Sequence, residues 1–546
     1  MTSRIRCRRL LPLVFLILFL PLGGCKTPDR WHAWQDDDRI GRPEQPETPV
    51  SLPESLQPRL SQPPSPTEAD SAGLLRLSVE QAVMMALANN RDLRAQQFGP
   101  VIAGTFEQIE RGAYDPELFA SLDYDEERAS ETSRSTGEQF DVKGRDTASV
   151  VGLRQRIPTG TTVEATVEHD RNLSSRTPEQ QTARLGLSVT QALLRGFGPG
   201  VNLVRVRQAE LETTASLYEL RGFTQSLLAE TEITYWHFVF ARESIRIFER
   251  SLAVARQQME EIEKRIEVGV LPAAEAAAAR AQVAGHEQAL IDARSLLEER
   301  RLRLLKLISP GSDGGFDRMV HAVSDPHIEP QPIRDLEDRL QLADRSRPDL
   351  EEARLRLEQN RLETVLTRNG LLPKLDLFVV LGKTGYADSF AESFQALDGD
   401  TYDAAVGVRL SQYIGNRTAK ARDLAARASR DQAREALANL RQIVRLDVRL
   451  AVNELERSRQ QISASRVTRT FREQTLAAEK QRFDVGVSTS LLVAQAQREL
   501  ISSQIDEVEA IVGYRIALVR LYLSEGSLLE RRGVLLADGG VSATDS

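Results

Sequence analysis

Apolar and polar residues alternate with a period of two in four short segments of the chain, which predicts β-strands with one apolar face. The segments are 118–124, 183–189, 375–381 and 404–410. Each strand is about ten residues long, the length that a tilted strand needs to cross a membrane. Long polar loops are predicted at 132–145 and 387–400. A soluble β-sandwich has the same alternation, so the pattern favours a membrane barrel and leaves the sandwich as an alternative.

Two much longer segments have a helical pattern and almost no helix-breaking residues. Residues 201–268 contain no proline and one glycine, and residues 417–485 contain neither. Each predicts a helix of about 68 residues, or roughly 100 Å at 1.5 Å per residue. Between Ile245 and Ile266, apolar residues recur at alternating steps of three and four, which predicts coiled-coil packing along a heptad seam. We expect this seam to be protein core.

Each long helix ends at a Val-Gly-Val sequence, which predicts a tight turn at the helix tip. Gly269 and Gly486 suit the left-handed position just past the end of a helix. Pro272 suits the first turn of a returning helix, and Ser488 is the predicted cap of the counterpart helix. Each long helix is therefore expected to form a hairpin with the helix that follows it.

A shorter helical segment precedes the strands in each half of the chain. Ser78 and Gln81 have the spacing of a capping box, so a helix is expected to begin there. The helical pattern continues to about Gly112, with a predicted break near Gly99-Pro100. The corresponding segment of the second half spans about 333–369.

The repeated order of these segments indicates an internal duplication at the scale of a domain. The first repeat is residues 74–308 and the second is 333–524, with a connection at 309–332 and a tail at 525–546. The matching sequences are 90–93 with 347–350 and Pro116 with Pro373, 257 positions apart, and 265–270 with 482–487, 217 positions apart. Because the offset falls by 40 positions, the first repeat carries about 40 extra residues between its strand and tip anchors.

The N-terminus has the pattern of a bacterial lipoprotein signal. Residues 1–24 hold four arginines and then an apolar run of about 13 residues, which is too short to span a bilayer. The run leads into Gly23-Gly24-Cys25, which resembles a lipobox, and Cys25 is the predicted lipidation site. An ordinary signal peptide with an unrelated cysteine is the alternative. Residues 25–73 are polar and proline-rich, which predicts an extended tether between the lipid and the folded body.

Composition and motifs exclude several classes of protein. The net charge is −8 and no basic run follows the leader, so we expect no nucleic-acid partner. The two cysteines, Cys7 and Cys25, exclude a disulfide framework and a cysteine-based metal site. His286-Glu287 begins a metalloprotease-type motif, but Leu290 stands where its second histidine is needed. The glycine-rich segment 196–200 is an incomplete dinucleotide fingerprint, so we expect neither an enzyme, nor a cofactor, nor a bound metal.

Together these features resemble the TolC-like outer-membrane efflux protein family over residues 74–524. The similar motifs are Leu77-Ser78-Val79-Glu80-Gln81-Ala82, Asn90-Arg91-Asp92-Leu93, Tyr235-Trp236, Leu372-Pro373 and the two Val-Gly-Val tips. The resemblance implies a mixed α-helical and β-barrel membrane protein. Three protomers share a transmembrane β-barrel, which a long periplasmic coiled-coil barrel of α-helices continues. It implies a passive, lipid-anchored channel of the bacterial outer membrane, serving a tripartite efflux or type I secretion system.

The resemblance also implies which residues meet the partners. In the family, the helical tips dock on a periplasmic adaptor protein of an inner-membrane pump. That role would fall here to Val268, Gly269, Val270, Val485, Gly486 and Val487. Some members form a constriction with an aspartate pair just past the second tip. This chain has Leu492 and Gln495 there, which predicts an apolar or amide-lined gate, and Glu275 near the first tip faces either the lumen or solvent.

The extra residues of the first repeat predict a further hairpin near 147–169. Apolar residues alternate in 151–157 and 163–167, on either side of a Pro158-Thr159-Gly160 turn. If this hairpin joins the barrel, a trimer has about 18 strands, and not the usual family number of about 12. If it does not, it is an accessory hairpin.

A structural coiled-coil lipoprotein that tethers the layers of the envelope is the main alternative to a channel. It accounts for the long helices and for Cys25, but not for the alternating strands or the duplication. The exported substrate and the identity of the pump and adaptor are left open by the sequence.

Overall fold

The computed structural model describes residues 59–60, 74–132, 134–175, 178–308, 315–332 and 335–535. The predicted signal peptide 1–24 and Cys25 lie outside the described residues. The same is true of most of the tether 25–73, of residues 309–314 in the connection, and of residues 536–546 in the tail.

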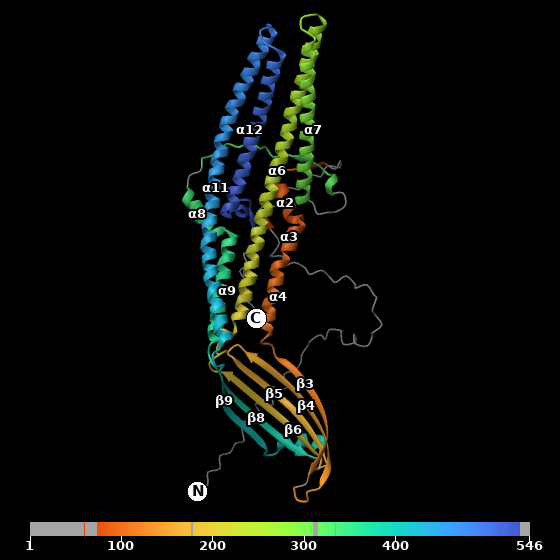
Figure 1. Cartoon of the computed structure of the whole chain (residues 1–546), viewed down its shortest axis with the longest axis vertical. Helices are drawn as coiled ribbons and strands as arrows, with labels where there is room; N and C mark the ends of the chain where they lie inside the picture. Colours follow the sequence, from red (N-terminus) through yellow and green to blue (C-terminus); the bar gives the residue numbers. More distant parts are fainter. Residues whose placement is uncertain are drawn as a thin grey trace, which may run out of the picture. The chain divides into compact units, whose positions relative to one another are not determined.

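Six strands form one antiparallel sheet, in the order β3-β4-β5-β6-β8-β9 (Figure 1). The strands are β3 Glu117–Thr132, β4 Gln139–Ile157, β5 Thr161–Ser174, β6 Gln180–Ala192, β8 Lys374–Ala387 and β9 Tyr402–Ser411. The two halves of the chain meet where β6 pairs with β8, from Gln181 opposite Ala387 to Ala192 opposite Asp376. The predicted extra hairpin is β4–β5, and it is a full member of this sheet.

The strand boundaries correct two of the predictions. The strands are 10 to 19 residues long, so most exceed the ten residues that the alternation indicated. The predicted loop 132–145 is largely strand, since β4 begins at Gln139 and pairs with β3 up to Thr132. Phe140 and Val142 alternate there with Asp141 and Lys143, but two apolar residues are too short a pattern to predict a strand among the polar residues around them. The predicted loop 387–400 contains a short helix, α10 Phe390–Gln395.

The helices before the strands begin where predicted but contain further breaks. They are α2 Val79–Asn89, α3 Arg91–Gln96 and α4 Phe98–Gly112 in the first half, and α8 Leu336–Ser346 and α9 Pro348–Asn369 in the second. The Ser78–Gln81 capping box is confirmed in both directions. The predicted break near Gly99-Pro100 is present two residues earlier, at Gln97, so that Pro100 lies in the first turn of α4, where no backbone partner for its nitrogen is needed. A second break, at Asn90, was not predicted.

The two predicted hairpins are present, and their long helices start and end within three residues of the prediction (Figure 1). The short α5 Pro199–Asn202 leads into the first of them. The hairpins are α6 Val204–Glu267 with α7 Ala274–Ile308, and α11 Arg417–Asp484 with α12 Ser490–Glu525. The heptad seam of α6 is confirmed as core, because Leu252 and Ala255 pack against Val283 and Leu290 of α7.

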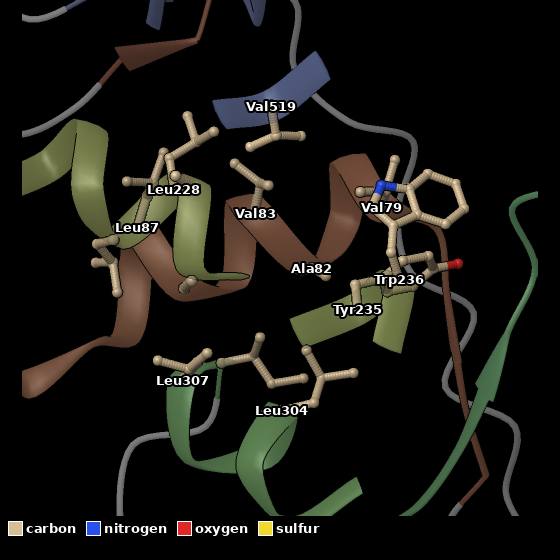
Figure 2. Close-up of a cluster of buried hydrophobic side chains, with 14 of the residues drawn as sticks. Val79, Ala82, Val83, Leu87, Leu228, Tyr235, Trp236, Leu304, Leu307 and Val519 are labelled. Carbon is tan, nitrogen blue, oxygen red and sulfur yellow. The ribbon is translucent and has the colours of Figure 1, made fainter. Parts of the chain in front are cut away.

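The largest core cluster lies where α2, α6, α7 and α12 meet (Figure 2). Tyr235 is fully buried there, and its hydroxyl donates to the Leu77 carbonyl at 2.9 Å and accepts from the Ser324 amide at 3.0 Å. The Trp236 ring packs edge-on against Tyr235, with the Arg515 guanidinium 5.0 Å from its centre. The Tyr235-Trp236 pair is therefore a structural feature that ties α6 to α12 and to the segments that contain Leu77 and Ser324.

Short elements tie the chain ends to this core. Strand β2 Leu74–Leu77 pairs in parallel with β7 Met319–Ala322, and β1 Arg59–Leu60 pairs with β10 Val534–Leu535. The remaining short helices are η2 Gly315–Asp317, η3 Ala396–Asp398 and α13 Leu528–Arg531.

A bidentate ion pair fastens the C-terminal segment to α6. The Arg532 guanidinium donates to both carboxylate oxygens of Glu232 at 2.6 Å. Glu232 is only 1% exposed, so burial raises the pKa of its carboxyl, and the Arg532 charge opposes that rise.

The helices α4, α6, α9 and α11 contact one another in that order, so α4 and α11 are the edges of a helical layer. The chain passes from α4 directly into the edge strand β3, and from the edge strand β9 directly into α11. Both edge helices expose large apolar side chains. They are Phe98, Ile102, Phe106 and Ile109 on α4, and Ile443, Leu446 and Leu450 on α11. Of the helices in the described ranges, none combines the length and apolar character needed to cross a membrane.

Candidate functional site

The two hairpin tips have the same backbone geometry. Gly269 and Gly486 both have a φ of 78°, which a glycine adopts without strain. At each tip the amide after the glycine reaches back five residues, from Val270 to the Arg265 carbonyl at 2.8 Å and from Val487 to the Arg482 carbonyl at 2.9 Å. These bonds satisfy carbonyls at the helix end that would otherwise lack partners, as in a Schellman motif. The predicted left-handed turns are thus confirmed.

The residues predicted to begin the returning helices lie outside them. Helix α7 begins at Ala274, so Pro272 belongs to the tip loop. The cap of α12 is Thr489, and the hydroxyl of Ser488 instead donates to the Glu479 carboxylate. Both tips are one to two residues longer than the sequence indicated, because the backbone first completes the left-handed turn.

Four valines project from the tips into solvent. Val268, Val270, Val485 and Val487 are between 65% and 75% exposed. Exposed apolar residues gathered at the end of a rigid support are typical of a protein-docking surface. We call these four valines the valine tips, and Gly269 and Gly486 shape the turns that present them.

A polar contact joins the ends of the two long helices. The Arg265 guanidinium of α6 donates to the Asp484 carboxylate of α11 at 3.1 Å, and it also lies 5.6 Å from the centre of the Phe483 ring. This contact was not predicted from the sequence. A signal was present in the repeat, since the matched sequences 265–270 and 482–487 both begin with arginine and both carry an acid two residues later.

A second contact links the returning helices. The Ser490 hydroxyl, at the start of α12, donates to the Glu275 carboxylate in the first turn of α7. Glu275 therefore bridges the two hairpins within one copy of the chain. Leu492 and Gln495 are exposed on the first turns of α12, beside the more exposed Leu491, which was not predicted. The role of these residues as a constriction stays a prediction.

A cavity of about 440 Å³ lies between the two hairpins just behind the tips. All four hairpin helices line it, with Ile262 and Arg265 on α6, Ala279 on α7, Phe483 on α11 and Leu491 on α12. The hairpins are thus held together by side chains at their ends and are not packed solidly against each other there.

A histidine of the first hairpin is buried, in addition to Glu232. His286 of α7 is 6% exposed, and its Nδ1 is 3.2 Å from the Ser251 hydroxyl of α6. Burial, together with the positive charge of Arg498 on α12, lowers the pKa of this imidazole. His286 is thus held neutral as part of the core, which fits the failure of the metalloprotease-type motif around it.

Comparison with known proteins places these features in a wider group. The family model described as outer membrane efflux protein matches residues 82–309 and 340–527. Outer membrane efflux protein BepC of Brucella suis biovar 1 (strain 1330) is 24% identical over 340 residues, which cover 62% of this chain and 71% of BepC.

Two solved structures have the same fold. The CmeC outer membrane channel of Campylobacter jejuni superposes with a TM-score of 0.62 at 16% identity, covering 90% of this chain and 98% of CmeC. The open state of the MtrE outer membrane channel of Neisseria gonorrhoeae gives 0.58 at 18% identity, with the same coverage. The resemblance inferred from the sequence motifs is confirmed by these matches.

Proposed function

We propose, because the chain belongs to the outer membrane efflux protein family, that three copies of it form one passive channel from the periplasm to the cell exterior. The family is one of outer-membrane efflux channels, and the fold is that of such channels. The trimer, the closed barrel and the coupling to a pump go beyond the family assignment and are part of the proposal.

The observation that carries the trimer is that every layer of one copy has two open edges. In the sheet, β3 and β9 each lack a neighbour on one side among the described strands. In the helical layer, α4 and α11 carry the exposed apolar stripes at the corresponding edges. Unpaired strand edges are strongly disfavoured in lipid, because backbone amides and carbonyls find no water there. A ring of three copies pairs each β3 with the next β9, and each α4 with the next α11.

The valine tips are the proposed docking site for a periplasmic adaptor of an inner-membrane pump. They are apolar, exposed and held at the ends of the two helical hairpins. The contacts between Arg265 and Asp484, and between Glu275 and Ser490, then hold the tips closed until the adaptor engages. The chain itself performs no chemical step in this proposal and needs no cofactor. The Cys25 lipid would add an anchor in the outer membrane to the one provided by the barrel.

The test is single-channel recording of the purified protein in a planar lipid bilayer. We expect discrete, reproducible conductance steps from a trimeric sample. Because closed tips would silence the full-length channel, a second form with residues 262–275 and 479–492 removed is recorded in parallel and is expected to conduct continuously. Silence from both forms, with the trimer intact by mass, would overturn the channel and favour the envelope tether.

A further inference from the structure

The hairpin β4–β5 carries the same two faces as the strands on either side of it. Cross-strand pairing places six residues in one row across the whole sheet. The row is Leu118, Leu153, Ala165, Leu187, Leu381 and Ala404. All six are apolar, so Leu153 of β4 and Ala165 of β5 continue the apolar row without a break. A hairpin outside a membrane wall would have no reason to continue an apolar row.

The residues on this face stay uncovered in a single copy. Leu153 of β4 is 49% exposed and Leu381 of β8 is 47% exposed, although both are leucines in the middle of a sheet. Val151 and Val167, the next pair along the hairpin, are exposed on the same face. An apolar surface of this extent on a sheet is typical of contact with lipid or with another protein.

The opposite face of the same hairpin is polar and is bridged by ion pairs. Arg154 of β4 lies 2.8 Å from the Glu164 carboxylate of β5 and 3.7 Å from that of Glu117 on β3. One step further along, Arg184 of β6 bonds Glu168 of β5 and, beyond β8, Asp403 of β9. Polar residues on one face and apolar residues on the other are the arrangement of a water-filled membrane barrel.

Aromatic residues mark one rim of the apolar face. Tyr402 is exposed at the start of the edge strand β9, and Tyr124 is exposed in the middle of the long edge strand β3. Helix α10 packs over the same face, with the Phe390 ring 4.6 Å and the Phe394 ring 6.0 Å from the imidazole of His169 on β5. Aromatic side chains gather in this way where a barrel wall meets the membrane interface. The extra hairpin thus contributes to the rim as well as to the apolar band.

We infer that β4 and β5 are part of the membrane wall, so that each copy supplies six strands and the trimeric barrel has eighteen. The inference rests on the proposed trimeric channel and deepens it. Six is an even number, so β3 and β9 run in opposite directions and the contact between neighbouring copies is antiparallel like every other pair in the sheet. Because barrel diameter grows roughly linearly with strand number, the barrel is about 1.5 times as wide as one built from twelve strands.

The wider barrel sits on a helical layer that has not grown. The hairpin adds no helix to the chain. The four strands β3 to β6 therefore lie between the same two helices, α4 and α5, that would enclose two strands without it. We therefore expect the outer-membrane section of the pore to be wider than the helical tunnel, and passage to be limited by the tunnel and its tips. The extra strands then serve the mouth of the channel, where they enlarge the exit and bring the acidic side chains of β5 into it.

The test places a lysine at matched positions inside and outside the hairpin. Leu153→Lys and Leu381→Lys lie in the same row and are equally exposed, so both put a charge at the same depth of the apolar face. Val150→Lys and Val380→Lys are the controls, since they lie on the polar face of the same strands, with Val150 directly opposite Glu168. The readout is the amount of protease-resistant trimer in the outer-membrane fraction, normalised to total chain.

We expect Leu153→Lys and Leu381→Lys each to lower this amount at least about tenfold, because a lysine in the lipid-facing band of a barrel strongly opposes insertion. Neither control should change it more than about twofold, since a lysine on the pore face stays in water. If Leu381→Lys lowers the trimer and Leu153→Lys does not, the hairpin lies outside the wall and the inference is overturned while the channel stands. If neither leucine variant has an effect, the proposed channel itself fails.

Image averaging of the wild-type trimer in lipid nanodiscs gives a second measurement that needs no variant. Eighteen strands around the pore are expected. Twelve strands, with β4–β5 folded away from the ring, would overturn the inference even if the lysine variants were poorly folded.

Discussion

Helices α6 and α11 take the same place in the two halves of the chain, and their lengths, 64 and 68 residues, are nearly equal. Their surroundings differ greatly. Helix α6 contacts α2, α3, α4, α7, α9 and α12, whereas α11 contacts only α8, α9 and α12 among the described helices with substantial contacts. As a result α6 buries Tyr235, Trp236 and even Glu232, while α11 leaves Leu446 and Leu450 in solvent.

This difference in packing shows which helix lies at the boundary of one copy of the chain. A long amphipathic helix gains most of its stability from packing, so an apolar face that finds no partner within the chain indicates a partner outside it. Helix α6 is complete within one copy. Helix α11 is an edge, and in the proposed trimer α4 of the neighbouring copy supplies the contact on its open side, as α9 does for α6 within one copy. Four variants test this contrast between a self-sufficient helix and an edge helix.

The largest effect is expected for Arg532→Ala, which removes the ion-pair partner of Glu232 on α6. Breaking a buried pair leaves an uncompensated carboxylate, which costs roughly 3 kcal/mol of folding free energy. Burial raises the pKa of Glu232 above its value in the unfolded chain, so protonation of this carboxylate stabilises the folded state relative to the unfolded state. The loss should therefore be smallest at a pH below the ordinary carboxyl pKa of about 4.3, and should grow as the pH rises.

Thermal unfolding followed by far-ultraviolet circular dichroism, at several pH values and fixed trimer concentration, measures this. Adding Glu232→Gln to Arg532→Ala is the control, because it removes the titrating group and with it the pH dependence. A loss of stability that is equal at every pH would show that Glu232 is not the group responsible, and that α6 is less self-contained than its burial indicates.

The next largest effect is expected on trimer assembly through the edge helices, and Phe106→Asp on α4 tests it. Phe106 is exposed in a single copy, so the substitution should leave helix content unchanged. In the proposed trimer it places a charge in an apolar interface, and we expect the trimeric fraction to fall about tenfold or more, since burying a phenylalanine contributes roughly 2 kcal/mol. Light scattering coupled to size exclusion in detergent gives the fraction.

The matched control on the same helix is Gln108→Asp, which adds the same charge away from the apolar stripe. It should leave the trimeric fraction unchanged. If Phe106→Asp assembles as well as the wild type does, the exposed stripe of α4 is not an interface between copies. The exposed apolar residues of an edge helix would then not indicate contact with another copy.

The sequence predicted the parts of this architecture that depend on local chemistry. The ends of α6 and α11 were placed within three residues, because long segments free of proline and glycine have few alternatives to a helix. The tip turns were placed correctly at Gly269 and Gly486, because a left-handed residue past a helix end is a local requirement. The extent of β4 was missed, because residues 139–146 are held in the sheet by backbone bonds and their apolar alternation is limited to Phe140 and Val142.

The contacts between the two hairpin tips could not be predicted from the sequence, for a different reason. Arg265 and Asp484 are 219 residues apart, and they meet only because two hairpins lie side by side. Likewise, nothing in the sequence of α11 distinguishes an apolar residue that packs within one copy of the chain from an apolar residue that packs against another copy. That distinction depends on which helices surround it, which is a property of the assembled fold.

A smaller effect is expected at the tips, where the ends of α6 and α11 touch. Arg265→Asp breaks the contact with Asp484, and because the pair is exposed it is worth no more than about 1 kcal/mol. Thermal stability should not change measurably, but the open fraction of the channel should rise roughly two- to fivefold per copy in bilayer recordings. The charge exchange Arg265→Asp with Asp484→Arg should restore the wild-type fraction. An unchanged open fraction in the single variant would show that this contact does not hold the tips.

The smallest effect separates the two hairpins by their response to acid. The sequence offset of 217 positions places Ser503 of α12 where α7 has His286, and both residues are buried. The second hairpin contains no histidine, so only the first hairpin, with His286 and His237, contains side chains that titrate near neutral pH. The pKa of His286 is lowered in the folded state, which means that protons bind more readily to the unfolded chain. Stability should be complete above about pH 6.5 and decline as the pH falls below that value. The pKa of His237 on α6 is lowered as well, by burial and by nearby arginines, so two imidazoles contribute to the decline. Because both are partly screened, the melting temperature should fall by only a few degrees.

His286→Gln, which keeps a polar side chain opposite Ser251, should reduce this decline, and His286→Gln combined with His237→Gln should abolish it, while Ser503→Ala leaves it intact. If the full decline persists in the double variant, the acid response belongs to carboxylates elsewhere and the two hairpins do not differ in this respect.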